Sequence, residues 1–224
     1  MIKVVTWFKR RAGLTPEAFV RHWQGQHAEK VVRMPGLRHY TQNPTHASAY
    51  EGGREPFVDG FAETWFDDTA ALRANAASEA YAAVREDEFA FLDVEGMVTI
   101  FCTEAVVLDG PRAPLKYAAF IRRRPGLDVE EFQRYWRTTH GPIAARNPYL
   151  RRYVQNHVRP SAYGAGRNPA FDGVPMTWFD SFDDLRASAS TPELAATRAD
   201  EVNFMDDPGG RLPFVIVTEH VVLP

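Results

Sequence analysis

Three features are scarce in this chain of 224 residues, and each scarcity excludes a class of protein. There is one cysteine, Cys102, so no disulfide can form within the chain, as is usual in a reducing cytoplasm. No apolar run approaches the roughly 20 residues that a membrane-spanning helix needs. The net charge is only −3, which provides no basic surface to collect the phosphates of nucleic acids. We therefore expect a cytoplasmic protein that has neither a membrane nor nucleic acid as a partner.

Short motifs for common cofactors are also missing. The sequence contains no Cys-x2-Cys pair, no His-Glu-x-x-His, no phosphate-binding loop and no Gly-x-Gly-x-x-Gly that opens a helix. We therefore predict no dedicated zinc, nucleoside triphosphate or dinucleotide site, and expect the protein to work without a cofactor.

The chain consists of two similar halves, displaced from each other by about 113 residues. A Trp-x3-His motif at residues 23–27 aligns with the same motif at residues 136–140. Residues 37–43 and 150–156 share the pattern Leu-Arg-x-Tyr-x-Gln-Asn. Roughly 40 of about 90 aligned positions are identical, which indicates a duplicated domain.

The joint between the halves lies at residues 109–114, where one glycine and two prolines end one strand and delay the next. We therefore predict one domain over residues 1–110 and a second over residues 111–224.

The hydrophobic pattern of each half predicts the order βαββαβ. In the first half we expect strands at residues 2–8, 37–43, 60–67 and 97–108. A first helix begins after Thr15, and Asp128 is the corresponding cap in the second half. A second, alanine-rich helix spans residues 69–92 with a break near Ser78. This order is the ferredoxin-like α+β fold, an antiparallel four-stranded sheet with both helices on one face.

Such a sheet leaves its second face bare, and tandem duplication supplies a partner for it. We expect the two sheets to pack face to face, so that the chain forms a barrel-like pair with an interior cavity. A further homo-oligomer would then be a separate association through the outer surfaces.

The motifs together resemble a known family. The run K-R-R-x-G-L-[TD]-x-E-x-F-x-R-x-W-x3-H is followed by L-R-x-Y-x-Q-N, T-W-F-D and a closing T-E-x-V-V-L. This combination is similar to the EthD domain of the dimeric α/β-barrel superfamily, and it covers nearly the whole of each half.

The resemblance implies several kinds of activity. The family is named for an accessory protein of an ether-degrading oxygenase system, and related fungal members are dehydratases or decarboxylases of aromatic polyketides. The wider superfamily includes muconolactone isomerases, cofactor-free monooxygenases and haem proteins. The fold alone does not choose among these activities.

His27 and His140 are the candidate catalytic residues. Each follows a tryptophan by one turn on the apolar side of the first helix, where hydrocarbon side chains are the rule. A histidine there can act as a general acid or base, because its pKa lies near neutrality. In the second half we expect Gly141 and Pro142 to end the helix, so that the helix dipole favours the protonated form of His140. The alternative is a structural imidazole that bonds to a backbone carbonyl group.

A second set of side chains is expected to bind the substrate. Tyrosine and asparagine close the second strand with hydrogen-bonding groups, tryptophan in the third strand offers a flat wall, and one histidine occurs in the second half only. The alternatives are turn formation and core packing. The predicted substrate-binding residues are Tyr40, Asn43, Trp65, Tyr153, Asn156, His157 and Trp178.

These observations predict a small-molecule protein that binds an aromatic or lactone-like compound in the interior cavity of the barrel-like pair. The leading hypothesis is histidine-based, cofactor-free acid/base chemistry of the isomerase, dehydratase or decarboxylase type. One alternative is an oxidoreductase component, either a cofactor-free monooxygenase or an accessory protein of an oxygenase pathway. The other is a non-catalytic binding or interaction module in which the histidines are structural.

Overall fold

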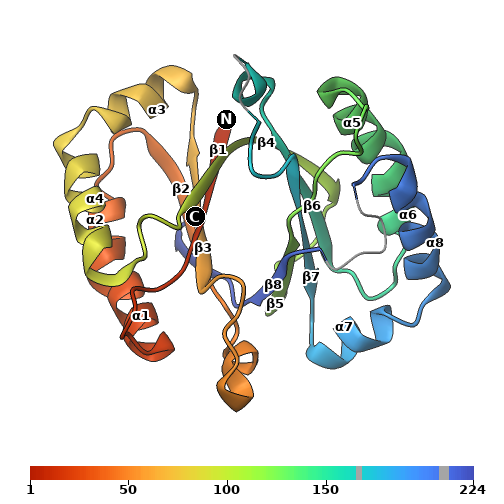
Figure 1. Ribbon diagram of the computed structural model, residues 1–224, viewed down its shortest axis with the longest axis horizontal. Coiled ribbons are helices and arrows are strands. Elements are labelled where there is room, and N and C mark those ends of the chain that lie inside the picture. Colours follow the sequence, from red (N-terminus) through yellow and green to blue (C-terminus); the bar gives the residue numbers. More distant parts are fainter. Residues whose placement is uncertain (165–167, 207–211) are drawn as a thin grey trace. The chain divides into compact units, whose positions relative to one another are not determined.

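The computed structural model describes residues 1–164, 168–206 and 212–224, and the chain divides into two compact units (Figure 1). Unit 1 comprises Met1–Phe101 together with Thr218–Pro224, and unit 2 comprises Cys102–Val217. The units therefore differ from the two sequence repeats, because the last residues of each repeat belong to the unit built from the other repeat.

Unit 1 contains a ferredoxin-like sheet with one extra strand. Its strand order is β4-β1-β3-β2-β9, with β1, β2 and β9 each antiparallel to the strand they are paired with. The first four strands give the predicted ferredoxin-like order, and the fifth comes from the end of the chain. The elements are β1 (Ile2–Phe8), α1 (Pro16–His22), the π-helical turn η1 (Trp23–His27), α2 (Ala28–Val31), β2 (Leu37–Pro44), the 3-10 segment η2 (Ala47–Gly53), β3 (Gly60–Phe66), α3 (Thr69–Ala76), α4 (Glu79–Phe91), β4 (Val98–Leu108) and β9 (His220–Leu223).

Unit 2 repeats this plan with the strand order β8-β5-β7-β6-β4. Here the extra strand is the second part of β4, whose residues from Cys102 to Leu108 pair with β6. The elements are β5 (Leu115–Ala119), α5 (Val129–Tyr135), the π-helical turn η3 (Trp136–His140), α6 (Gly141–Ala144), β6 (Arg152–Val158), the 3-10 segment η4 (Pro160–Tyr163), β7 (Gly173–Phe179), α7 (Phe182–Ser188), α8 (Pro192–Asp200), the 3-10 segment η5 (Glu201–Asn203) and β8 (Phe214–Val217).

At the end of the second repeat the hydrophobic pattern predicts a single strand over residues 212–223, the counterpart of residues 97–108, and this prediction is wrong. The structure has two strands there, β8 and β9, separated by Thr218 and Glu219. The break has a physical reason: β8 pairs with β5 in unit 2, whereas β9 pairs with β2 in unit 1. At the break, the Thr218 amide donates to the Pro44 carbonyl oxygen, 3.1 Å away.

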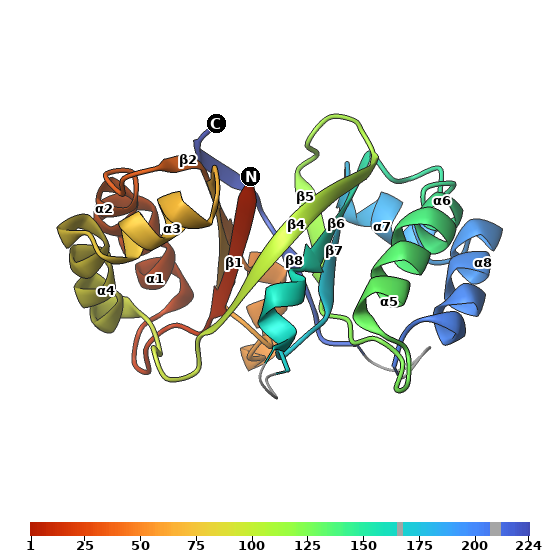
Figure 2. The same ribbon diagram turned by 90° about the horizontal axis from the view of Figure 1, so that it is seen from above.

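In each unit the helices cover one face of the sheet: α1 to α4 in unit 1 and α5 to α8 in unit 2 (Figure 2). The predicted caps are confirmed. Thr15 Oγ1 accepts the amide of Ala18 at 3.2 Å, and Asp128 Oδ1 accepts that of Glu131 at 2.7 Å. Ser78 caps α4 after the predicted break in the second helix. The α+β, ferredoxin-like prediction for both repeats is therefore correct.

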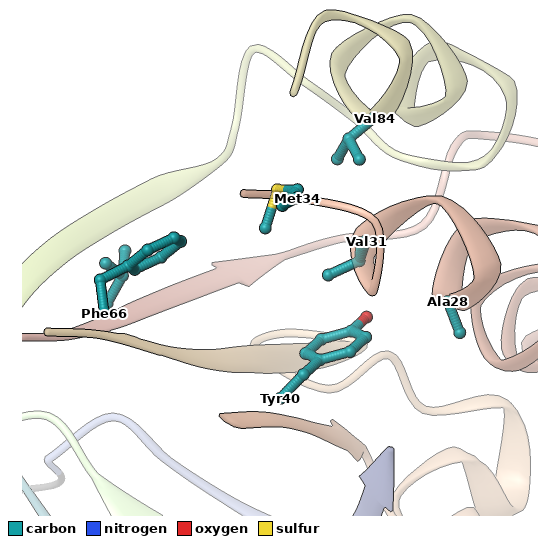
Figure 3. Packing of buried hydrophobic residues seen from close by; sticks show 7 residues of the cluster. Ala28, Val31, Met34, Tyr40, Phe66 and Val84 are labelled. Carbon is teal, nitrogen blue, oxygen red and sulfur yellow. The ribbon is translucent and has the colours of Figure 1, made fainter. Parts of the chain in front are cut away.

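The core of unit 1 lies between its sheet and its helices. Val31 and Val84 project from α2 and α4 toward Tyr40 and Phe66 on the sheet (Figure 3). A second buried cluster beside it is mainly aromatic, with the rings of Phe19 and Trp23 packed at a centroid distance of 5.5 Å. Unit 2 repeats the arrangement with Phe132 and Trp136 at 5.7 Å. Each fully buried aromatic side chain of this kind stabilises the fold by about 1.5–3 kcal/mol.

Candidate functional site

A π-helical turn interrupts the first helix of each repeat at the Trp-x3-His motif. It spans Trp23–His27 in unit 1 and Trp136–His140 in unit 2, and both residues of each motif are buried. Such turns are rare and occur often at functional sites. The wider turn places the indole and the imidazole on the side of the helix that faces the sheet, where both line a cavity.

A hydrogen-bonded triad joins this turn to the second strand. Trp23 Nε1 donates to Tyr40 Oη at 3.1 Å. Gln42 Nε2 donates both to Tyr40 Oη and to the carbonyl oxygen of Trp23, each at 2.8 Å. In unit 2, Trp136 donates to Tyr153 at 3.1 Å, and Gln155 donates to Tyr153 at 3.0 Å.

The triad fixes the direction in which each tyrosine hydroxyl group can donate. An indole N–H and an amide N–H are both donors, so Tyr40 Oη accepts two hydrogen bonds and has both lone pairs occupied. No described residue accepts the remaining hydroxyl proton of Tyr40, and the side chain lines the cavity. Tyr40 and, by the same reasoning, Tyr153 therefore keep one hydroxyl proton that can be donated to a group in the cavity. Burial raises the pKa of Tyr153 to about 12 and that of Tyr40 further, so both hydroxyl groups stay protonated.

Each histidine of the motif is held by an aspartate from the last long helix. His27 Nδ1 lies 2.9 Å from Asp87 Oδ2, and His140 Nδ1 lies 2.9 Å from Asp200 Oδ2. Burial lowers the pKa of His27 to about 4, more than the neighbouring carboxylate raises it, and the pKa of His140 is lowered for the same reason. Both rings are therefore neutral at pH 7. The aspartate accepts the Nδ1 proton, which leaves Nε2 as a lone-pair acceptor.

The two aspartates have different surroundings. Asp87 also bonds to His22 Nε2 at 3.1 Å and to Lys30 Nζ at 2.5 Å. Burial would raise the pKa of Asp87, but the hydrogen bonds from Lys30 and the two histidines bring it down to about 2. Asp200 bonds instead to neutral donors, the Tyr135 hydroxyl at 2.6 Å and the Asn203 amide at 2.9 Å.

Both histidine–tyrosine pairs open onto a cavity between the helices and the sheet of their own unit. The cavity of unit 1 has a volume of about 350 Å³ and that of unit 2 about 480 Å³. His27 and Tyr40 line the first, and His140 and Tyr153 line the second. Apolar side chains form most of both walls. Small-molecule sites are of this kind, apolar with a few convergent polar groups.

Each cavity is also lined by a carboxyl group that is not among the residues predicted from the sequence. Glu88 lines the cavity of unit 1 beside Arg85, and Glu201 lines that of unit 2 with Arg198 at 3.0 Å. Burial raises the pKa of Glu88 to about 7 despite the arginine. The signal for these residues is the pattern Arg-x-Asp-Glu, which both repeats share at residues 85–88 and 198–201. It marks the histidine's aspartate and the cavity carboxyl group together.

The remaining predicted residues of unit 1 lie on the other face of its sheet. Side chains alternate along a strand, so Asn43 points away from the face that carries Tyr40. Asn43 Nδ2 donates to Glu63 Oε1 at 2.9 Å, and Glu63 pairs with Lys3 at 2.5 Å. Lys3 Nζ in turn lies 4.7 Å from the centre of the Trp65 ring.

The predicted residues of unit 2 follow the same alternation. Asn156 Nδ2 donates to the Val174 carbonyl oxygen at 2.8 Å, and Lys116 Nζ lies 4.8 Å from the centre of the Trp178 ring. His157 lies on the same side of β6 as Tyr153, so it faces the helices, and its ring lies 4.4 Å from that of Trp136. Burial lowers the pKa of His157 to about 4.

One expectation about His140 is wrong. Gly141 and Pro142 do not end the helix, because α6 continues from Gly141 to Ala144. Pro142 falls in the first turn of α6, where a missing N–H group costs little. His140 therefore lies inside a helix rather than at its C-terminal end, and burial keeps it neutral.

Within the described part of the chain, no helix is long and apolar enough to cross a membrane. Nor do residues 1–164, 168–206 and 212–224 bring together three or more His, Cys, Asp or Glu side chains that could hold a metal ion.

Solved structures with a similar fold include an anthrone oxidase-like protein, with a TM-score of 0.66 and 12% sequence identity over 99% of this chain and 93% of that protein. Another is a mutant chlorite dismutase from Candidatus Nitrospira defluvii, with a TM-score of 0.54 and 10% identity over 99% of this chain and 91% of the other. At such identities the likeness concerns the fold.

Comparison by sequence identifies the family. No protein of curated function matches the chain significantly. The model of the EthD domain matches residues 11–95 and 124–208, once in each repeat. Each match includes one Trp-x3-His motif, its tyrosine and its aspartate. The chain thus belongs to the EthD domain family and carries the domain twice.

Proposed function

We propose that each unit binds an apolar aromatic or lactone-like carbonyl compound in its cavity and moves a proton on it without a cofactor. The observation that carries this proposal is the pairing, in one cavity, of a neutral histidine with a tyrosine whose hydroxyl proton is left for a ligand. The first group accepts a proton, and the second donates a hydrogen bond to a ligand oxygen.

In unit 1 the tyrosine binds the carbonyl oxygen of the substrate. As a proton leaves the carbon skeleton, negative charge collects on that oxygen, and the Tyr40 hydroxyl group stabilises it. A preorganised donor in a dry cavity stabilises such charge more strongly than water does. Trp23 and Gln42 strengthen the donor, because hydrogen bonds in a chain polarise one another.

His27 accepts the proton at Nε2. Asp87 holds the ring in the required tautomer and stabilises the imidazolium ion that forms. Return of the proton to another atom gives an isomerisation. Transfer of the proton from the imidazolium ion to a β-hydroxyl group, which then leaves as water, gives a dehydration. In a decarboxylation the same tyrosine stabilises the enolate that forms as carbon dioxide leaves, and that enolate then takes up a proton. In unit 2, His140, Tyr153 and Asp200 have the same roles.

A second candidate function is oxidation. A substrate that has lost a proton to His27 is electron-rich, and electron-rich enolates of aromatic ketones react with molecular oxygen. An anthrone oxidase-like protein shares the fold, which favours including this reaction in the test.

Anthrone serves as the test substrate, because it has one carbonyl group and one acidic carbon within an apolar aromatic frame. We would incubate the protein with anthrone in D2O and measure deuterium uptake at the acidic carbon by mass spectrometry, with an oxygen electrode in a parallel sample. The double variant His27→Gln, His140→Gln should lose exchange above the buffer rate and remain folded. Exchange that persists in this variant would contradict the proposal. Oxygen uptake with the native protein would identify the oxidation.

A further inference from the structure

A buried amide group distinguishes the two cavities. Asn75, in the last turns of α3, is only 3% exposed and lines the cavity of unit 1. Its Oδ1 atom accepts no hydrogen bond from any residue that the structure describes. Buried polar atoms are nearly always hydrogen-bonded, so an acceptor that borders a cavity points to a donor supplied by the occupant.

The corresponding atoms of unit 2 are satisfied within the protein. Ser188 occupies the position of Asn75, and Asn147 occupies that of Met34. Asn147 Nδ2 donates to Ser188 Oγ at 2.8 Å, and Asn147 Oδ1 accepts the Tyr149 amide at 3.1 Å. Both side chains line the cavity of unit 2. In unit 1 the thioether of Met34, which also lines its cavity, has no hydrogen to donate, so Asn75 gains no such partner.

The cavities also differ in size, at about 350 Å³ in unit 1 and about 480 Å³ in unit 2. The smaller cavity thus contains the unpaired acceptor of Asn75, whereas in the larger cavity Asn147 and Ser188 are hydrogen-bonded to each other.

We infer, building on the function proposed above, that the two cavities select different ligands. Unit 1 takes an aromatic carbonyl compound that also carries a hydroxyl or N–H group, which donates to Asn75 while the carbonyl oxygen accepts from Tyr40. Unit 2 takes a larger carbonyl compound that lacks this donor. A site built to bond a ligand hydroxyl group rejects the analogue without it, because its own polar group is then left buried and unpaired.

A matched pair of probes tests this selectivity, namely 6-hydroxy-1-tetralone and 6-methoxy-1-tetralone. Both have the aromatic ketone, and only the first has a donor at the far end. The indole N–H signals of Trp23 and Trp136 in NMR spectra of the whole protein report each cavity separately. We expect the hydroxy compound to titrate the Trp23 signal with an affinity about tenfold higher than the methoxy compound. At Trp136 the preference should be absent or reversed.

Two variants assign the effect to the amide. Asn75→Leu has nearly the same size without the acceptor, and it should reduce the preference at Trp23 to near one while the Trp136 titration stays unchanged. The reciprocal double variant Asn147→Met, Ser188→Asn installs the pair of unit 1 in unit 2 and should create the preference at Trp136.

The outcomes separate this inference from the proposed function. Equal affinity of both probes at Trp23, or a preference that survives Asn75→Leu, overturns the inference and leaves the proton-transfer proposal intact. Failure of both probes to shift either indole signal overturns both. Loss of anthrone exchange in the histidine variants is independent of Asn75 and bears on the proposed function alone.

Discussion

The indole N–H group of Trp23 donates to the hydroxyl oxygen of Tyr40 at 3.1 Å, and the same bond joins Trp136 to Tyr153 at 3.1 Å in the second repeat. A glutamine from the same strand donates to each hydroxyl oxygen as well. The two bonds place the hydroxyl proton of each tyrosine at the cavity. The function proposed for each unit depends on that proton.

Replacement of both tyrosines by phenylalanine tests this dependence. The variant Tyr40→Phe, Tyr153→Phe keeps the rings and removes the donors, so anthrone exchange should fall by about 10²–10³-fold, as when an oxyanion donor is lost. Each glutamine loses one acceptor, which should destabilise the fold by about 1–2 kcal/mol per site. Exchange measured by mass spectrometry and unfolding measured in urea give the two values. Exchange that stays within a few-fold of the native rate would remove the tyrosines from the mechanism.

The aspartates are positioning residues, and their loss should affect turnover more than binding. In a His27→Gln background, only unit 2 carries a complete set of groups, so that unit alone is measured. Asp200→Asn keeps the shape and offers the wrong hydrogen-bonding group to His140 Nδ1, so kcat should fall by about 10²–10⁴-fold with little change in KM. Tyr135→Phe removes another partner of Asp200 and is the control, expected to retain most of the activity. A rise in KM with an unchanged kcat would indicate a purely structural role for Asp200.

Glu88 makes stability depend on pH. Its pKa is about 7 in the folded protein against an ordinary value of 4.5, so folding favours the protonated form. This stabilisation is complete below pH 4.5 and is lost as the pH rises through 7. Between these values the free energy of unfolding falls by up to about 1.4 kcal/mol for each increase of one pH unit. Glu88→Gln should remove this decline between pH 5 and pH 8, as measured by urea unfolding. Glu86 lies two residues before Glu88 on the same helix and is exposed, so Glu86→Gln should leave the decline in stability unchanged. Parallel pH curves for the native protein and Glu88→Gln would contradict the assignment.

Much of the fold could be predicted from the sequence because the relevant signals are local. The caps at Thr15 and Asp128, the break at Ser78 and the branched residues of each strand depend on their neighbours in the chain. Because the sequence is duplicated, each helix and strand is indicated twice, once in each repeat. Strand exchange has no local signal, because residues 218–223 read as a continuous strand whichever sheet they join.

The candidate site was predicted in part. The motif identifies His27 and Tyr40, but a histidine at helical spacing looks the same in an α-helix and in a π-helical turn. Its partner Asp87 lies 60 residues further along the chain, so the contact exists only after the fold brings α4 against η1. The role inferred for Asn75 could not be predicted from the sequence, because it depends on which polar atoms the folded protein leaves without a hydrogen-bond partner.

The first residue of β3 must be a glycine if the tryptophan of the motif is to keep its place. A Cβ atom on Gly60 would lie 2.7 Å from Trp23 Cζ3 and 3.0 Å from the Asn43 carbonyl oxygen, and one on Gly173 would collide with the Trp136 ring. Gly60→Ala should therefore cost about 1–3 kcal/mol of unfolding free energy by overpacking. The cost should shrink in a Trp23→Leu background, which removes the ring. Additive effects of the two substitutions in urea unfolding would show that the ring is not the obstacle.

Deletion of residues 218–224 tests the strand exchange. These residues belong to unit 1, where β9 pairs with β2 through Tyr40, Thr41 and Gln42. Without β9, strand β2 becomes an exposed edge, and the strand that carries Tyr40 loses its neighbour on one side. Hydrogen exchange followed by mass spectrometry should show lost protection in β2 and β3 and no loss in β6 and β7, because β6 keeps its pairing with β4. Deuterium uptake by anthrone should decline in unit 1 only. The truncated protein should therefore be nearly inactive in a His140→Gln background, where only unit 1 is complete. In a His27→Gln background, where only unit 2 is complete, it should retain its rate. Loss of protection in both units would mean that the terminal residues stabilise the chain as a whole rather than the sheet of unit 1.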